Sequence, residues 1–131
     1  GGTALLLDES YNANSVSMAA TLAVLGAQPA RRRIAILGEM RELGDESARL
    51  HAGLAAPLTE AGVDIAILVG PGMAPLAEAL SGKLDVHHLD HADAALALAR
   101  DVLRAEDAVL VKGSNAVGLA RVVAGLTAGE I

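Results

Sequence analysis

Residues 5–15 read LLLDESYNANS, an apolar run that ends in two carboxylates and continues into hydroxyl and amide side chains. A helical pattern of apolar residues begins shortly afterwards, at Met18. Open α/β folds bind ligands where a strand passes through a polar loop into a helix, because loops at the carboxyl ends of parallel strands meet helix N-termini there. The loop holds Tyr11, the single tyrosine of a chain without Phe or Trp. We therefore expect a binding site at this loop.

The same succession of apolar run, loop and helical pattern recurs along the chain. It predicts repeated βα units and a mainly parallel sheet of about five strands. The predicted strands are Ala4–Leu7, Arg33–Leu37, Ile65–Val69, Val86–Leu89 and Ala108–Val111. The fourth has the weakest pattern, because His87 and His88 interrupt it.

The intervening segments carry apolar residues three or four positions apart, so each predicted helix can cover one face of the sheet. These residues are Met18, Leu22 and Leu25; Leu50, Leu54 and Leu58; Met73, Leu76 and Leu80; Leu96, Ala99 and Leu103; Leu119, Val123 and Leu126. The predicted fold is a three-layer α/β/α Rossmann-like sandwich. Pro57 predicts a kink or break in the second helix, and Gly26, Gly62 and Gly82 lie where helices are expected to end.

The composition is that of a folded domain with an aliphatic core, since hydrophobic residues make up 53% and aromatic residues 1% of 131 residues. We find no linker, so residues 1–131 are predicted to form a single domain. The net charge of −6, with basic residues scattered apart from Arg31–Arg33, argues against a nucleic-acid surface. The lack of cysteine excludes thiolate chemistry, and no apolar run approaches the roughly 20 residues that span a bilayer. The start at Gly1, without methionine, predicts a piece of a longer protein.

The polar side chains of the first loop suit a nucleoside. Carboxylates at a strand end accept hydrogen bonds from ribose hydroxyls, and a ring beside amides can hold a planar base. The candidate nucleotide-binding residues are Asp8, Glu9, Tyr11, Asn12 and Asn14. The alternative is that Asn14 or Ser15 only caps the following helix and that the other side chains are solvated.

A second loop, residues 38–44, reads GEMRELG and follows the second predicted strand. Its two glycines frame charged residues and can bring Glu39 or Arg41 toward a ligand at the same edge of the sheet as Tyr11. His51 follows in the next helix, where a lone histidine is more often a partly exposed helical residue than a functional one.

A third loop begins at Lys112, which ends the most apolar predicted strand. Gly113 allows close approach of the backbone, and Ser114 is placed to cap a helix whose amino end favours anions. A phosphate or carboxylate suits this loop. The alternative is a capped helix beside a solvated lysine.

Two motifs are rejected. Gly82-Lys83 is followed by Leu84 and lacks the upstream glycine, so it is not a nucleoside-triphosphate P-loop, and no dinucleotide fingerprint is present. His87, His88 and His91 do not predict a metal site, because neighbouring strand residues point to opposite faces. We expect no metal site.

Three segments together, DESYNAN at 8–14, LGEMRELG at 37–44 with His51 after it, and VKGS at 111–114, resemble the C-terminal domain of the Mur ligases. The resemblance extends to Val123. It implies the third domain of a cytoplasmic ATP-dependent amide ligase in peptidoglycan precursor synthesis, and hence in cell wall biogenesis, cell shape and cell division. The N-terminal domain of such an enzyme holds the UDP-sugar. The central domain holds most of the ATP and Mg²⁺.

The resemblance further implies that D-alanyl-D-alanine is added to UDP-N-acetylmuramoyl-tripeptide through an acyl phosphate, and that this domain closes over ATP and the dipeptide. Without a P-loop, the fragment alone is predicted to be inactive and to hold no catalytic residue of its own. A related ligase acting on another amino acid or on folate is an alternative. The Tyr11–Asn14 run favours the dipeptide enzyme through resemblance alone.

Transferred residue by residue, the resemblance directs Asp8 and Glu9 to the ribose and Tyr11, Asn12 and Asn14 to the nucleotide. On the dipeptide side it places Lys112 and Ser114, with Arg41 and His51. This chain has Glu9 where the family usually has aspartate. It has Asn115 where the family commonly has arginine, which removes a carboxylate clamp there.

A protein of another class, a free-standing α/β nucleotide-binding or regulatory module, is the remaining alternative. Receiver-like modules need an aspartate after the third strand. Here that strand runs into Gly70-Pro71-Gly72, without an acidic residue.

Overall fold

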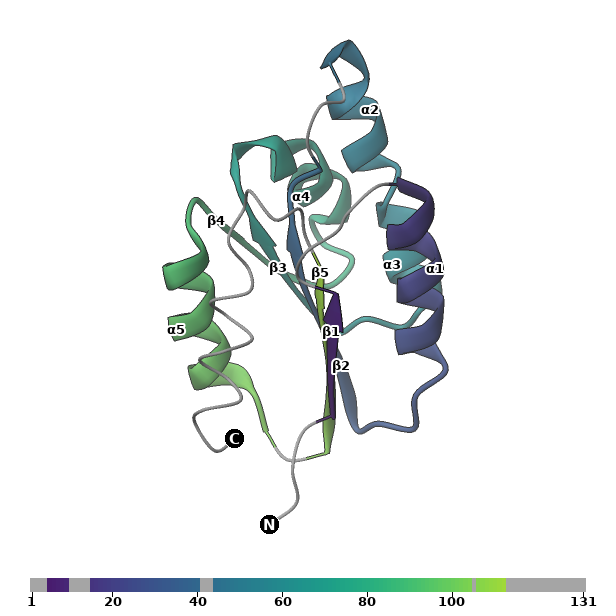
Figure 1. The fold of residues 1–131 in the computed structure, drawn as a ribbon, viewed down its shortest axis with the longest axis vertical. Coiled ribbons are helices and arrows are strands. Elements are labelled where there is room, and N and C mark those ends of the chain that lie inside the picture. Colours follow the sequence, from purple (N-terminus) through teal and green to yellow (C-terminus); the bar gives the residue numbers. More distant parts are fainter. Residues whose placement is uncertain (1–4, 10–14, 41–43, 105, 113–131) are drawn as a thin grey trace.

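The computed structural model describes residues 5–9, 15–40, 44–104 and 106–112, with side chains from Met18 onward (Figure 1). Five strands form one sheet in the order β1-β5-β2-β3-β4, and every ladder between neighbours is parallel. The strands are β1 Leu5–Glu9, β2 Arg32–Gly38, β3 Ile65–Val69, β4 Asp85–Leu89 and β5 Asp107–Lys112. The predicted parallel sheet is confirmed, including the weakly patterned fourth strand.

Helices connect successive strands. They are α1 Ser15–Gly26, α2 Ser47–Ala52, α3 Ala55–Glu60, α4 Ala74–Leu80 and α5 Ala92–Val102, with short 3₁₀ turns η1 Gly44–Glu46 and η2 Pro71–Met73. No helix within the described ranges is long and apolar enough to cross a membrane. The predicted helix at Leu119–Leu126 lies outside the described residues.

The helices cover both faces of the sheet, as the sequence predicts. Side chains of α1, α2, α3 and α4 join one core cluster, and those of α5 join the other. Figure 1 shows α1 and α3 on one side of the sheet and α5 on the other. Right-handed crossovers require this division, because the chain moves one way along the sheet from β1 to β4 and reverses between β4 and β5.

The two cores pair large side chains with small ones, which allows close packing without aromatic rings. Ile and Val side chains of the sheet face α5, whose buried residues are Ala92, Ala95 and Ala99. On the other face, alanines and leucines alternate along the strands, and α1 packs against them with Met18, Leu22 and Leu25, each fully buried. In the core between the sheet and α1, the small residues therefore lie on the sheet. In the core between the sheet and α5, they lie on the helix.

The second predicted helix is broken, but the break precedes the proline. α2 ends at Ala52, Gly53 and Leu54 form a turn, and Pro57 lies in the first turn of α3. Proline is tolerated there because the amide it lacks has no intrahelical acceptor. Gly62 and Gly82, with φ of +72° and +79°, end α3 and α4 as predicted.

The strand order brings the first and last strands of the described chain together. β5 lies between β1 and β2, so Glu9 pairs with Lys112 on one side and Leu37 pairs with Lys112 on the other. We call the carboxyl ends of these strands, at Glu9, Lys112 and Gly38, the rim. All three predicted loops leave the sheet from the rim.

Candidate functional site

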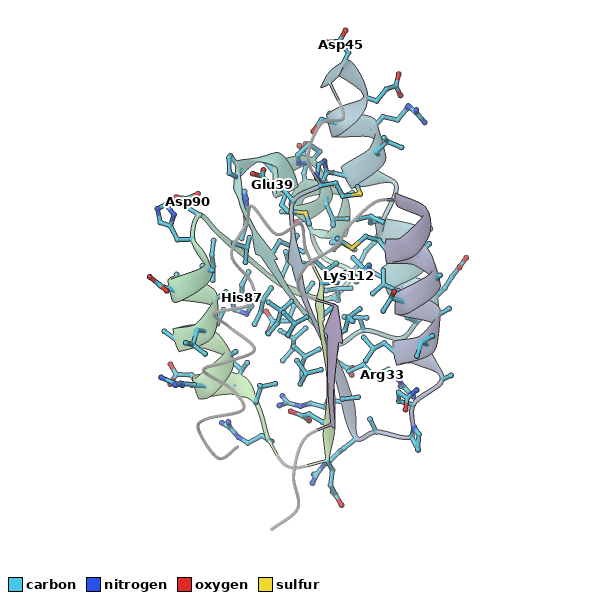
Figure 2. The ribbon with its side chains drawn as sticks, viewed as in Figure 1. Arg33, Glu39, Asp45, His87, Asp90 and Lys112 are labelled. Atoms are coloured by element: carbon cyan, nitrogen blue, oxygen red, sulfur yellow. The ribbon has the colours of Figure 1, made fainter. Side chains whose placement is uncertain are left out.

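Lys112 is the central charged residue of the rim. It is 1% exposed, although it ends a strand at the edge of the core. Ala108 and Leu110 of β5 contact the α1 side of the sheet, and strand alternation gives Lys112 the same face. Figure 2 shows it on that side. The alternative of a solvated lysine is therefore wrong.

A buried ammonium is costly unless an anion or a hydrogen-bond acceptor lies close to it. Among the residues whose side chains are described, from Met18 onward, no carboxylate forms an ion pair with Lys112. Its position at the end of a parallel strand is one where α/β folds bind ligands. The arrangement suits an anionic group of a ligand at the rim.

Glu39 follows β2 and ties two loops of the sheet together. Its Oε2 accepts a hydrogen bond of 2.6 Å from the Gly72 amide in η2. Its own amide donates to the Val69 carbonyl at 3.0 Å. Figure 2 shows Glu39 at the upper end of the sheet, where α4 begins. The side chain therefore joins the end of β2 to the loop after β3.

The Gly70-Pro71-Gly72 sequence is explained by this contact. A Cβ added to Gly72 would lie 2.6 Å from Glu39 Oε2, and one added to Gly70 would lie 2.7 Å from Glu39 Cδ. Gly70 also has a φ of +107°, which other residues rarely adopt. Sequence reasoning missed this contact, and two glycines flanking a proline at a strand end are the signal that marks it.

His51 is fully buried, and both of its ring nitrogens contact other groups. Nε2 accepts a hydrogen bond of 2.8 Å from the Met40 amide. Nδ1 lies 2.7 Å from the Ser47 carbonyl, to which it donates. These bonds require the neutral ring with its proton on Nδ1. His51 is not the partly exposed residue expected from sequence, because its ring is buried and bonded to backbone groups. Its contact with a substrate stays a prediction.

Several predicted site residues cannot be placed. Tyr11, Asn12, Asn14, Arg41 and Ser114 lie outside the described residues. For Asp8 and Glu9 the structure gives the backbone, which ends β1 beside β5. Of the predicted residues whose side chains are described, Lys112 belongs to the rim and His51 supports it from α2.

The histidines near β4 have separate surroundings. His88 Nε2 lies 2.7 Å from the Gly70 carbonyl. His87 Nε2 lies 3.2 Å from Asp85 Oδ1, without hydrogen-bond geometry. His91 precedes α5. No group of three or more metal-ligating side chains occurs in the described ranges.

The opposite end of the sheet carries a structural ion pair. The Asp107 carboxylate accepts hydrogen bonds from Arg32 Nε at 3.0 Å and Arg32 Nη2 at 2.8 Å, and Oδ2 also accepts the Arg104 amide at 2.8 Å. The hydrogen bond with Asp107 raises the pKa of Arg32 above its ordinary value, against the opposing effect of desolvation. This cluster joins the starts of β2 and β5 to the end of α5, far from the rim.

A parallel sheet covered on both faces, with its charged loops at one rim, defines an α/β ligand-binding domain. Residues 2–115 match the family model described as Mur ligase, glutamate ligase domain. The chain belongs to this family.

Two curated relatives are named UDP-N-acetylmuramoyl-tripeptide–D-alanyl-D-alanine ligase. The one from Mycobacterium tuberculosis (strain CDC 1551 / Oshkosh) is 38% identical over 99% of this chain and 30% of its own length. The one from Synechocystis sp. (strain ATCC 27184 / PCC 6803 / Kazusa) is 35% identical over 98% of this chain and 28% of its own length. The chain therefore spans less than a third of these relatives.

Two solved structures share the fold. MurF from Acinetobacter baumannii superposes with a TM-score of 0.83 at 25% identity, covering 98% of this chain and 29% of that one. MurF ligase from Thermotoga maritima, in complex with ADP, gives a TM-score of 0.76 at 24% identity, covering 93% of this chain and 27% of that one.

Proposed function

We propose that residues 1–131 form the C-terminal domain of an ATP-dependent ligase that adds D-alanyl-D-alanine to UDP-N-acetylmuramoyl-tripeptide. The observation that carries the proposal is the rim, where β1, β5 and β2 end side by side in a chain of the Mur ligase family. The names of the curated relatives support these substrates. The ADP in the Thermotoga maritima structure supports a nucleotide cosubstrate.

The proposed reaction takes place in the cytoplasm and uses three domains of one chain. ATP transfers its γ-phosphoryl group to the tripeptide carboxylate, giving an acyl phosphate and ADP. The dipeptide amine then attacks the acyl carbon, an amide bond forms and inorganic phosphate leaves. This chain has no P-loop, so the preceding domains supply the phosphate and Mg²⁺ contacts. Its own part is to complete the pocket by closing over ATP and the dipeptide.

The two sides of the rim have different proposed tasks. β1 leads into the loop with Tyr11, Asn12 and Asn14, and with Asp8 and Glu9 this loop would contact the nucleotide. β5 and β2 would contact the dipeptide, whose carboxylate suits the buried Lys112 ammonium. The family resemblance gives Ser114 and Arg41, which lie outside the described residues, the same proposed task.

The test uses the intact enzyme with ATP, UDP-N-acetylmuramoyl-tripeptide and D-alanyl-D-alanine. We expect formation of the pentapeptide product with equimolar ADP and phosphate. Lys112→Ala should lower kcat/KM for the dipeptide by about tenfold or more, because it removes a charged contact. Tyr11→Ala should instead raise KM for ATP, because Tyr11 belongs to the loop proposed to contact the nucleotide.

Circular dichroism of both variants provides the folding control. No product from the intact wild-type enzyme would refute the proposed substrates. Wild-type kinetics in both folded variants would remove these residues from the pocket.

A further inference from the structure

The geometry points to His51 and Glu39 as positioning residues that fix the carboxyl end of β2 beside Lys112. Neither residue is assigned contact with a substrate. The inference names the dipeptide as the affected ligand, and in this respect it rests on the proposed function. Its first step is the connection between α2 and the backbone that follows β2.

His51 makes this connection through a single ring. Nε2 accepts the Met40 amide at 2.8 Å, while Nδ1 donates to the Ser47 carbonyl at 2.7 Å. Met40 is 4% exposed, so water cannot readily replace the ring as acceptor for its amide. The ring therefore sets the distance between the start of α2 and the residue two positions after β2.

Glu39 acts on the neighbouring residue from another direction. Its carboxylate receives the Gly72 amide at 2.6 Å, and its backbone amide is bonded to the Val69 carbonyl at 3.0 Å. Gly70 and Gly72 leave no room for a Cβ beside this side chain. Residues 39 and 40 are thus held to β3 and η2 on one side and to α2 on the other.

The consequence for ligands follows from strand order. Leu37 of β2 pairs directly with Lys112, whereas β1 is separated from β2 by the whole of β5. A shift at the end of β2 therefore reaches the Lys112 side of the rim first. Binding of the dipeptide should suffer, and binding of ATP beside β1 should not.

The test compares matched variants of the intact enzyme. His51→Leu removes both ring hydrogen bonds, while His51→Gln keeps a carbonyl oxygen that can accept the Met40 amide. We expect His51→Leu to raise KM for D-alanyl-D-alanine about tenfold or more through misplacement of the rim. KM for ATP should stay within about twofold of the wild-type value. His51→Gln should recover most of the loss.

Glu39 provides a second, independent pair should His51→Leu fail to fold. Glu39→Ala removes the acceptor for the Gly72 amide, and Glu39→Gln keeps one. We expect Glu39→Ala to show the same selective rise in KM for D-alanyl-D-alanine, and Glu39→Gln not to show it. Unchanged KM values in a folded Leu or Ala variant, or equal rises for both substrates, would overturn the inference.

Hydrogen exchange separates this inference from the proposed function. In the intact enzyme, the Met40 amide should exchange more slowly in the wild-type protein and in His51→Gln than in His51→Leu. If the wild-type enzyme forms no pentapeptide product, the proposed function fails, while this exchange difference still supports the positioning role. Equal exchange of Met40 in all three proteins would refute that role whatever the reaction.

Discussion

The two most deeply buried charged residues of the described chain have opposite surroundings. Asp107 receives three hydrogen bonds from Arg32 and the Arg104 amide, so its negative charge is fully compensated. Lys112, at the other end of the same strand, forms no ion pair with any carboxylate whose side chain is described. Buried charge is retained at a cost in stability. A compensated carboxylate therefore indicates a structural role, whereas the role of Lys112 toward a ligand stays a prediction.

The structural role of Asp107 predicts that Asp107→Asn destabilises the domain by about 1 to 3 kcal/mol, because an amide nitrogen would face the Arg32 guanidinium. Urea unfolding measures the change. The matched control is Glu46→Gln, which breaks the exposed Arg49–Glu46 pair and should change stability by less than about 0.5 kcal/mol. Equal effects of the two substitutions would contradict the assignment.

The ion pair has a defined pH dependence on its arginine side. The pKa of Arg32 is raised by its hydrogen bond to Asp107. A raised pKa of a base stabilises the folded state below the unfolded-state pKa and loses this effect as the pH rises through the folded-state pKa. Ionisation of Arg32 should therefore leave stability unchanged from acid to moderately alkaline pH. Urea titrations at several pH values check this, and loss of stability from Arg32 near neutral pH would contradict it.

Residue types and spacing predict candidate ligand contacts, but not which side chains support them. The bond of His51 to Met40 spans 11 positions and that of Glu39 to Gly72 spans 33. Neither spacing corresponds to a helical or strand period. The buried state of Lys112 was missed for a similar reason, since it depends on the helices that cover β5.

At the level of elements, the apolar patterns predict strand positions to within about two residues. β4 forms despite its two histidines because it pairs only with β3 within the described sheet, and each of its residues is half-buried or exposed. The break in the second helix was expected at Pro57 and lies at Gly53–Leu54 instead. A proline fixes where a helix can begin more strictly than where the preceding one ends.

The packing of α1 on α3 predicts the effect of Gly26→Ala. A Cβ at Gly26 would lie 2.9 Å from Ala61 Cα, a backbone atom that cannot rotate away. Overpacking costs about 1 to 3 kcal/mol, which exceeds the gain of up to about 1 kcal/mol expected from alanine in a helix. We expect a net loss of stability in urea unfolding.

Val24→Ala is the control for this substitution, because Val24 lies on the same helix and is 50% exposed. Its effect should stay within about 0.5 kcal/mol. A Gly26→Ala protein more stable than wild type would show that α1 and α3 do not approach as closely as described.

For the molecule as a whole, the alternation of strands and helices predicts the α/β/α layers, and the comparison structures share this fold. Strand order could not be read from the pattern, since nothing local in β5 specifies insertion between β1 and β2. The three loops singled out by the sequence resemblance follow β1, β5 and β2, which end side by side. The tasks of their individual side chains stay predictions.

Division of the pocket among domains predicts that residues 1–131 alone bind ATP too weakly for a calorimetric isotherm at micromolar protein, and do not hydrolyse it. The chain has no P-loop, and phosphate contacts supply much of the affinity for a nucleotide. The intact enzyme under the same conditions is the positive control. Tight binding or hydrolysis by the isolated domain would contradict the proposal.

The central place of β5 has a consequence during synthesis on the ribosome. Of the described strands β1 is synthesised before the others, yet its partner β5 begins only at Asp107. A nascent chain that ends before Asp107 can pair β2, β3 and β4, while β1 still lacks β5, its only partner among the described strands. Such late, long-range pairing slows folding and leaves apolar segments open to aggregation. Translation of β5, which carries Lys112, is thus the step that completes the described sheet in its native strand order.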